Sequence, residues 1–434
     1  MRSTSPDRPA AHRGWRRAGA AAASAAALVF AGLGTAVQAD AATVSSKVTW
    51  TATPCATPKH KGELACDSYR VTGGLTAFQK QQAARTGVTP KAADAATPSG
   101  YGPTNLQSAY GLTSAAASNG SGETIAIVDA YNDPNAESDL ATYRSYYGLS
   151  ACTTANGCFK KVSQTGSTTS LPSSDAGWSE EISLDLDMAS AVCPKCNILL
   201  VEATSATMAN LGKAVNEAVT LGAKYVSNSY GGSESSSDTS YDSSYFNHPG
   251  VAITVSAGDS GYGAEYPAAS RYVTSVGGTA LKTSSTTRGW TETVWKTSST
   301  EGTGSGCSSY DTKPSWQTDT GCAKRTISDV SAVADPATGV SVYDSYGVTA
   351  GWYTFGGTSA SSPIIAAVYA LAGTPSSSSY PASFPYTKAG TSALNDVTSG
   401  NNGSCTTTYL CTAQTGYDGP TGWGTPEGVS AFTG

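Results

Sequence analysis

Strand-like and helix-like segments alternate along this chain from Tyr101 to its C-terminus. The strand-like runs are short and apolar, and they lie at 124–129, 198–202, 225–229, 251–256 and 272–276. Helix-like runs cover 177–192 and 208–221, and another begins at Ser359 and ends before Gly373. Such alternation is typical of a mostly parallel sheet flanked by helices. We therefore predict an α/β fold with one large domain, whose functional loops follow the carboxyl ends of the strands.

The first 41 residues have the pattern of a secretory signal peptide. Three arginines at 13, 16 and 17 precede an apolar stretch at 18–34, and small residues suited to cleavage follow. A linker rich in Ala, Pro, Ser and Gly covers 90–102. We predict a signal peptide at 1–41, a short N-terminal segment at 42–97 and the main domain at 98–434. No other run reaches the roughly 20 apolar residues of a membrane span, so we expect a secreted, extracellular protein without a membrane partner.

Ten cysteines in an exported chain indicate disulfides. The sequence leaves their connectivity open, but five short local loops are the simplest pairing: Cys55/Cys66, Cys152/Cys158, Cys193/Cys196, Cys307/Cys322 and Cys405/Cys411. The third couple follows a helix instead of starting one, which favours a structural disulfide over a redox motif or half of a zinc site. Charged residues make up 13% of the chain and its net charge is −6, so no nucleic-acid partner is expected.

Ser359 lies in a Gly-Gly-Thr-Ser-Ala-Ser-Ser-Pro stretch at 356–363, just before a small apolar run. The pattern predicts a serine at a helix N-terminus, where free N–H groups can stabilise an oxyanion. A serine hydroxyl needs a base to become a nucleophile. The chain has three histidines, of which His12 lies in the leader and His60 in the short N-terminal segment, and His248 is the third. If the chain is a serine hydrolase, its expected base is therefore a carboxylate.

The predicted helix at 177–192 carries four acidic residues. At about 100° per residue, Glu181 and Asp185 fall on its apolar face, whereas Glu180 and Asp187 are expected to face water. Buried carboxyl groups cost free energy unless they are paired or used, and a like-charged neighbour raises a carboxyl pKa. Two interpretations remain open: a functional pair that shares a proton, or structural groups bonded to backbone or a lysine.

Asp259 follows the strand-like run 251–256, between Gly258 and Gly261. A protonated carboxyl at this place could donate a hydrogen bond to an oxyanion, although Asp-Ser-Gly is also ordinary turn chemistry. His248 precedes the same strand, and an extended chain of this length puts roughly 25–30 Å between the two residues. We therefore expect His248 to be a surface-loop residue at the other end of the sheet.

Together these features resemble the sedolisins, or serine-carboxyl peptidases, which have a subtilisin-like fold and use Ser-Glu-Asp in place of Ser-His-Asp. The resemblance runs from about Tyr101 to the C-terminus and rests on eight motifs in the family's order. They are Glu181 and Asp185 with the intervening Leu184, then 191–194, 227–231, 256–261, 266–270, 276–279, 328–336 and 356–363.

The resemblance implies a role for each of four residues. Ser359 would be the nucleophile, Glu181 its general base and later acid, and Asp185 the residue that orients Glu181. Asp259, in its protonated form, would join the Ser359 N–H in the oxyanion hole. The resemblance further implies an accessory acid and a stretch that pairs with the substrate backbone: Asp129, and Ser229, Tyr230 and Gly231.

One structural Ca²⁺ near the C-terminus is also implied by the resemblance. Its candidate ligands are Asp396, Val397, Gln414, Gly416 and Asp418. Two carboxylates with several backbone carbonyls suit Ca²⁺. The stretch 405–411 separates the two halves of this set, and the alternative is a pair of loop aspartates without metal.

The function that the resemblance implies is a secreted, monomeric endopeptidase that hydrolyses proteins or peptides through an acyl-enzyme. Acidic pH is expected because a carboxyl base works best near its own pKa. The segment 42–97 is shorter than the family's usual propeptide, which leaves two interpretations: a reduced propeptide, cut between Lys91 and Tyr101, or a segment that stays attached through a Cys55/Cys66 disulfide. Two alternatives are a catalytically inactive secreted binding scaffold of the same fold, and an ordinary subtilisin-like enzyme that uses His248.

Overall fold

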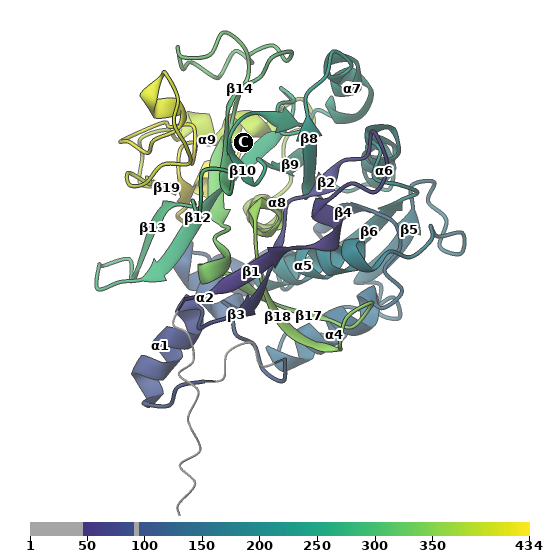
Figure 1. Ribbon diagram of the computed structural model, residues 1–434. Coiled ribbons are helices and arrows are strands. Elements are labelled where there is room, and N and C mark those ends of the chain that lie inside the picture. Colours follow the sequence, from purple (N-terminus) through teal and green to yellow (C-terminus); the bar gives the residue numbers. More distant parts are fainter. Residues whose placement is uncertain (1–46, 91–94) are drawn as a thin grey trace, which may run out of the picture. The chain divides into compact units, whose positions relative to one another are not determined.

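An eight-stranded, mostly parallel sheet lies at the centre of the structure, a computed structural model that describes residues 47–90 and 95–434 (Figure 1). The strand order is β13 (Trp290–Val294), β12 (Thr274–Thr283), β9 (Ala252–Ser256), β7 (Tyr225–Asn228), β4 (Thr124–Ala130), β6 (Asn197–Ala203) and β5 (Phe159–Ser163), with β16 (Val330–Val333) paired to β12. Only β13 runs antiparallel to its neighbour within this sheet. The predicted α/β fold is confirmed, and the predicted signal peptide lies outside the described residues.

Helices cover both faces of this sheet. One face carries α2 (Pro103–Ala109), α4 (Ala136–Tyr146), α5 (Ala176–Val192) and α8 (Thr358–Ala372), and the other carries α6 (Met208–Thr220). Alternation along β4 explains the two cores: Ile125 and Ile127 pack with the first group, whereas Ala126 and Val128 pack on the α6 side. Strands buried on both faces have continuous apolar sequences, which is why these strands could be predicted from the sequence.

Smaller sheets and short helices complete the described part of the chain. The sheets are β1 (Thr49–Ala52), β3 (Tyr69–Gly73), β18 (Gly351–Gly356) and β17 (Val340–Asp344); β11 (Glu265–Tyr266), β8 (Tyr230–Ser233) and β2 (Ala65–Cys66); β10 (Ser260–Tyr262), β14 (Gly302–Cys307) and β15 (Thr326–Ile327); and β19 (Leu394–Asn395) with β20 (Thr425–Pro426). The short helices include η1 (Pro54–Ala56), α1 (Ala77–Thr86), α3 (Thr113–Ser118), α7 (Asp238–Tyr241), the π-helix η2 (Asp242–Phe246) and α9 (Phe384–Thr387).

Helix α5 is buried on all sides. Asp175 caps its N-terminus by accepting hydrogen bonds from the N–H groups of Gly177 and Trp178. Glu181 and Asp185 are buried as predicted, but the prediction that Glu180 and Asp187 face water is wrong, because they are only 2% and 1% exposed. Elements distant in sequence cover that side of the helix. Arg70 of β3 forms an ion pair with Glu180, and the Tyr343 N–H of β17 donates to Asp187.

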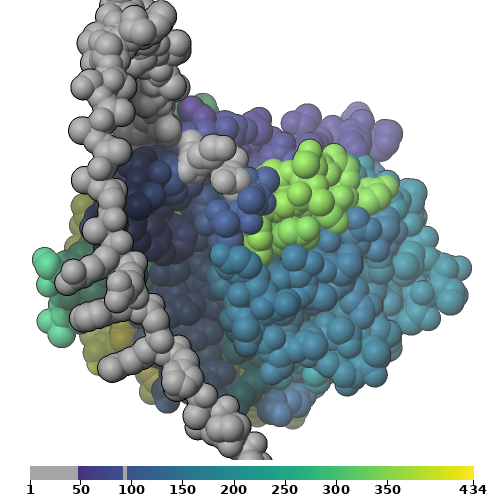
Figure 2. Space-filling view, turned by 90° about the horizontal axis from the view of Figure 1, so that it is seen from below, coloured from purple at the N-terminus to yellow at the C-terminus, as the bar shows by residue number. Residues whose placement is uncertain are grey.

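The described part of the N-terminal segment, residues 47–90 and 95–97, belongs to the same compact unit as the rest of the described chain. Its strand β3 pairs with β18 and so extends the β17–β18 ribbon. Figure 2 shows this ribbon in light green, bordered by N-terminal residues in purple and blue. The boundary at 97/98 therefore remains a prediction from composition.

The five predicted disulfides are all present. The predicted strand at 272–276 differs from the structure: β12 continues to Thr283 because β13 and β16 pair along it beyond β9. Among the described residues, no helix combines the length and the apolar character that crossing a membrane requires.

Candidate active site

Ser359 lies in the first turn of α8 and is fully buried. Gly357, with φ of 101°, forms the entry to the helix, a conformation that favours glycine. The Ser359 hydroxyl donates to the Ser229 carbonyl oxygen at 3.2 Å. The segment around Ser359 thus presents a serine at a helix N-terminus, as the sequence predicted.

Glu181 of α5 faces this serine. The hydroxyls of Ser359 and Ser68 act on its carboxyl and lower its pKa, but burial and the Asp129 charge dominate and raise that pKa well above its usual value. Neither carboxyl oxygen of Glu181 makes a hydrogen bond of standard geometry within the described residues. The group is therefore a desolvated carboxyl beside a serine hydroxyl, which is the arrangement a proton acceptor needs.

Asp185 and Asp129 extend this acidic cluster. The Ser229 hydroxyl lies 2.9 and 2.7 Å from the two carboxyl oxygens of Asp185, which share its one proton. Burial, with the charges of Asp129 and Glu181, raises the pKa of Asp185 well above its usual value. Asp129 is the last residue but one of β4, and its carboxyl has no hydrogen-bond partner among the described residues. Burial together with the Glu202 charge raises its pKa to about 8. Three buried carboxyls this close cannot all ionise independently, so the cluster retains protons.

Asp259 meets the same helix N-terminus from the loop after β9. Its Oδ1 accepts from the Thr358 N–H at 2.7 Å and the Thr358 hydroxyl at 2.8 Å, whereas Oδ2 has no partner among the described residues. Burial, followed by the Asp67 charge, raises its pKa well above the usual value. A protonated Oδ2 is therefore free to donate a hydrogen bond.

The two histidines in the described part of the chain, His60 and His248, take no part in this arrangement. Nε2 of His248 lies 2.8 Å from Oδ1 of Asn216 on α6, and the imidazole is half-buried beside that helix. Within the described residues, no histidine hydrogen-bonds to Ser359. His60 lies exposed in the N-terminal segment.

Comparisons with known proteins identify relatives of this chain. Residues 165–383 match the Subtilase family. Kumamolisin from Bacillus sp. (strain MN-32) is 31% identical over 366 residues, and sedolisin from Pseudomonas sp. (strain 101) is 31% identical over 369 residues. These matches cover 77% and 76% of this chain. The solved structure of Pseudomonas sedolisin, a serine-carboxyl proteinase complexed with two molecules of pseudo-iodotyrostatin, matches with a TM-score of 0.63 and 28% identity, over 76% of this chain and 96% of that one.

The chain belongs to the sedolisin family. Its subtilisin-like α/β fold and the predicted resemblance are both confirmed. The match spans 63% of the length of kumamolisin and 60% of that of sedolisin.

In this sedolisin-family chain the predicted substrate strand is already paired. β8 begins at Tyr230, directly after Ser229, and hydrogen-bonds with β11 on one side and β2 on the other. Cys66 lies opposite Tyr230, and Ala65 lies opposite Gly231. The N-terminal segment therefore occupies the edge of β8 to which a substrate backbone was predicted to bind.

Four residues near Ser359 were not found by sequence reasoning. Asp67 and Ser68 lie in the N-terminal segment and approach Ser359 and Glu181, while Ser256 and Glu265 surround the Asp67 side chain. The chain separates Asp67 from Ser359 by 292 positions. No local pattern marks such a contact.

The predicted calcium ligands come together in one C-terminal loop region. Asp396 accepts from the Gly416 N–H at 2.8 Å, and the buried Asp418 accepts from the Gln414 N–H at 3.1 Å. Burial raises the pKa of Asp418 to about 7, and the nearby Asp396 charge contributes. Among the described residues, the carbonyl oxygens of Val397, Gln414 and Gly416 accept no hydrogen bond. Two carboxylates with unused carbonyls fit a hard cation such as Ca²⁺.

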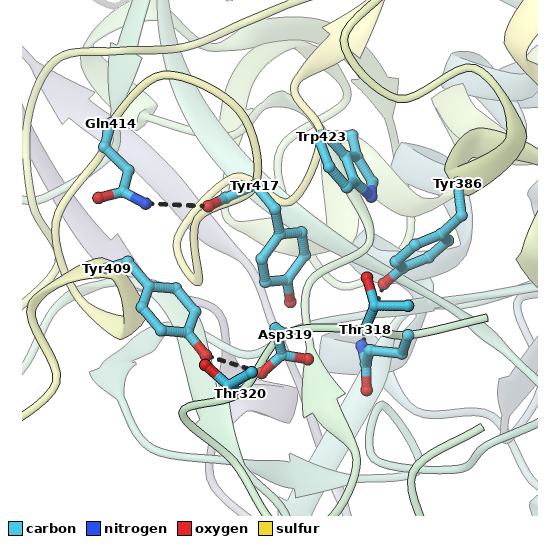
Figure 3. A pocket seen from close by; sticks show the side chains of 9 residues that line it. Thr318, Asp319, Thr320, Tyr386, Tyr409, Gln414, Tyr417 and Trp423 are labelled. Carbon is cyan, nitrogen blue, oxygen red and sulfur yellow. Dashed lines mark hydrogen bonds between the residues drawn. The ribbon is translucent and has the colours of Figure 1, made fainter. Parts of the chain in front are cut away.

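An aromatic pocket lies beside this loop (Figure 3). Its walls include Tyr386, Tyr409, Tyr417 and Trp423, and the Tyr409 hydroxyl donates to Asp319 at 2.7 Å. None of the lining residues contacts Ser359 through a hydrogen bond, so the pocket has no part in the site built around that serine.

Proposed function

We propose that this protein is a secreted serine-carboxyl endopeptidase that hydrolyses peptide bonds of proteins or peptides at acidic pH. The observation that carries the proposal is the buried Glu181 carboxyl facing the Ser359 hydroxyl at a helix N-terminus. Membership of the sedolisin family supports it, since the relatives named above include a serine-carboxyl proteinase.

In the proposed reaction Ser359 Oγ attacks the substrate carbonyl carbon and its proton passes to Glu181. Glu181 then protonates the leaving amine, and water hydrolyses the acyl-enzyme with Glu181 again as base. Asp185, fixed by the Ser229 hydroxyl, positions the cluster, and Asp129 is an accessory group that shares its protons. The Ser359 N–H and protonated Asp259 stabilise the oxyanion.

Acidic pH follows from two opposite requirements. Glu181 must be ionised to accept a proton, whereas Asp259 must keep its proton to donate one. Burial raises both pKa values, with the Asp129 charge adding to that of Glu181 and the Asp67 charge to that of Asp259. Protonation of Glu181 therefore sets the acidic limit of activity, and ionisation of Asp259 sets the alkaline limit.

A structural Ca²⁺ is the further part of the proposal. The Asp396 and Asp418 carboxylates and the carbonyls of Val397, Gln414 and Gly416 would hold it, and it would stabilise the C-terminal loops without taking part in the reaction. A monomer is proposed, with 98–434 as the catalytic domain.

The decisive experiment compares Glu181→Gln with His248→Ala in digestion of denatured casein at about pH 4 and pH 8. Glu181→Gln should abolish turnover while the circular dichroism spectrum stays unchanged, because the base is lost but the volume is kept. His248→Ala should remain nearly fully active. Loss of activity in His248→Ala, or full activity in Glu181→Gln, would contradict the carboxylate mechanism. A wild-type chain that binds casein but never cuts it would instead favour the inactive binding scaffold.

A further inference from the structure

The N-terminal segment runs through the site as an extended peptide. After β2 pairs antiparallel with β8, the backbone of Asp67 reaches Ser359. Its N–H donates to Ser359 Oγ at 3.0 Å, and its carbonyl oxygen accepts from the Ser359 N–H at 2.9 Å. The same Asp67 N–H also lies 3.4 Å from the Ser229 carbonyl oxygen. A peptide added to a strand edge beside a nucleophile has the geometry of a bound substrate.

The Asp67 carbonyl oxygen points toward the proposed oxyanion hole, formed by the Ser359 N–H and Asp259. A side-chain carbon placed on Gly357 would collide with this oxygen and would lie 2.6 Å from Oδ2 of Asp259, so both oxygens border one small space. That Oδ2 is the atom of Asp259 without a partner among the described residues. The carbonyl therefore lies where the Ser359 N–H and a protonated Asp259 can both stabilise the negative charge that develops on it.

The Asp67 side chain fills a pocket of its own. Ser256 donates to its Oδ2 at 2.6 Å, and only 6% of the residue is exposed. Glu265 lies beside it at the edges of Gly231 and Gly258. Burial raises the pKa of Asp67 to about 7 and that of Glu265 to about 8. This surrounding suits a neutral side chain with an oxygen acceptor, either a protonated carboxylic acid or a carboxamide.

The loop 53–66, which the Cys55–Cys66 disulfide closes, holds both sides of the Asp67–Ser68 peptide bond. On the N-terminal side, Cys66 is joined to Cys55 by a disulfide. On the C-terminal side, Thr53 donates its N–H to the Ser68 carbonyl at 3.1 Å, and its hydroxyl lies 2.8 Å from that of Ser68. Strand β1 then pairs with β3 beyond this point.

We propose that the Asp67–Ser68 bond is a processing site cut by the chain's own Ser359, an inference that rests on the proposed peptidase function. Ser359 Oγ bonds to the Asp67 carbonyl carbon, and its proton passes through Glu181 to the Ser68 nitrogen as the C–N bond breaks. Water then hydrolyses the ester to the Asp67 carboxylic acid and restores the Ser359 hydroxyl. The cleaved peptide thus ends in Asp67, and the new chain begins at Ser68.

The disulfide-closed loop controls how far this reaction goes. Because Cys55, Thr53 and β1 keep Asp67 and the Ser68 amine together, the cut ends stay in the cleft and can be rejoined, and another substrate reaches Ser359 only while they are out of the cleft. The linker predicted to be cut, 91–101, is placed differently in its described part: Ala95 accepts from the Trp352 N–H, and Tyr101 donates to the Gly339 carbonyl. Neither residue hydrogen-bonds to Ser359.

The test uses the full chain, incubated at about pH 4 and followed by N-terminal sequencing and intact mass. Wild type should acquire a new N-terminus at Ser68, and Ser359→Ala should not. The double variant Cys55→Ser/Cys66→Ser should be cut about tenfold faster and should digest casein faster, since the loop no longer holds the cut ends. The matched control, Cys152→Ser/Cys158→Ser, removes another short disulfide loop and should cut like wild type. If the first pair prevents folding, Thr53→Ala loosens the same clamp from the other side.

The outcomes separate this inference from the proposed function. A chain that digests casein while no variant shows an N-terminus at Ser68, or that is cut only within 91–101, overturns the processing site and leaves the peptidase function standing. Equal cutting in the Cys55/Cys66 and Cys152/Cys158 variants overturns the role of the loop. A chain that cuts neither casein nor itself, in wild type and in the loosened variants alike, contradicts the peptidase function.

Discussion

At the scale of single residues, the site is governed by carboxyl groups that the fold has removed from water. Burial raises the pKa of Glu181 and of Asp185, and the Asp129 charge adds to both. Burial and the Asp67 charge raise the pKa of Asp259 at the helix N-terminus. An imidazole in place of Glu181 would be cationic below its pKa and neutral above it. A carboxyl is neutral below its pKa and anionic above it. The cluster therefore suits proton transfer in acid, where an imidazole base would be protonated and inactive.

Asp259 allows a test at this scale. Its proton is needed for donation, so its ionisation should set the alkaline limit of kcat/KM. In Asp259→Asn the amide donates at every pH, and we expect activity to extend to higher pH even if its maximum is lower. Asp259→Ala has no donor and should lose about 10²–10³ in kcat. A pH–rate profile of the three proteins decides it. An unchanged alkaline limb in Asp259→Asn, with less than about tenfold loss in Asp259→Ala, would place Asp259 outside the reaction.

At the scale of elements, the local sequence pattern predicted the structure correctly where the segments packed against an element are near it in sequence. The helix α5 and the burial of Glu181 and Asp185 followed from periodicity alone. The same periodicity failed for Glu180 and Asp187, because β3 and β17 cover that side of the helix and lie more than 100 residues away along the chain. For the same reason, the composition of the linker at 90–102 suggested a detachable N-terminal segment. In the structure that segment runs past Ser359.

Removal of metal tests the Ca²⁺ site proposed in the C-terminal loops. If Ca²⁺ binds only the folded loop, free metal at about 100 times its Kd stabilises the protein by about 2.7 kcal/mol. In Ser359→Ala, used to prevent self-digestion, a chelator at about pH 6 should lower Tm, and Ca²⁺ should restore it better than Mg²⁺ does. The effect should shrink in acid because the ligand carboxylates must be ionised. Asp418→Ala should abolish the response. A Tm that ignores both chelator and Ca²⁺, with no calcium by elemental analysis, would leave the two aspartates as loop residues.

At the scale of the whole molecule, buried carboxyl groups are spread well beyond the site. Burial raises the pKa of Asp133 and Glu202 to about 7 near the end of β4, and of Asp311 to about 8 near β14, with the Asp242 charge adding to the last. With only 13% charged residues, the chain has few surface ion pairs to lose in acid. Because of these groups, the free energy of unfolding should fall as pH rises. An ordinary salt-bridged carboxylate, whose pKa is lowered in the folded state, has the opposite effect.

That linkage gives a prediction with a definite sign. Each of these carboxyls has a higher pKa in the folded state than the value of about 4 expected in the unfolded chain, so the folded state binds protons more tightly. The resulting stabilisation is fully present below about pH 4 and is lost as pH rises through about 7 to 8. We therefore expect Tm of Ser359→Ala, measured by calorimetry without added metal, to fall from pH 5 to pH 8. Asp311→Asn should flatten that fall, since both of its carboxyl oxygens are buried without a hydrogen-bond partner in the described structure and an amide does not ionise. A Tm that rises over this range would mean that these carboxyl groups are ionised and paired in solution, and the acid-adapted character inferred from their burial would not hold.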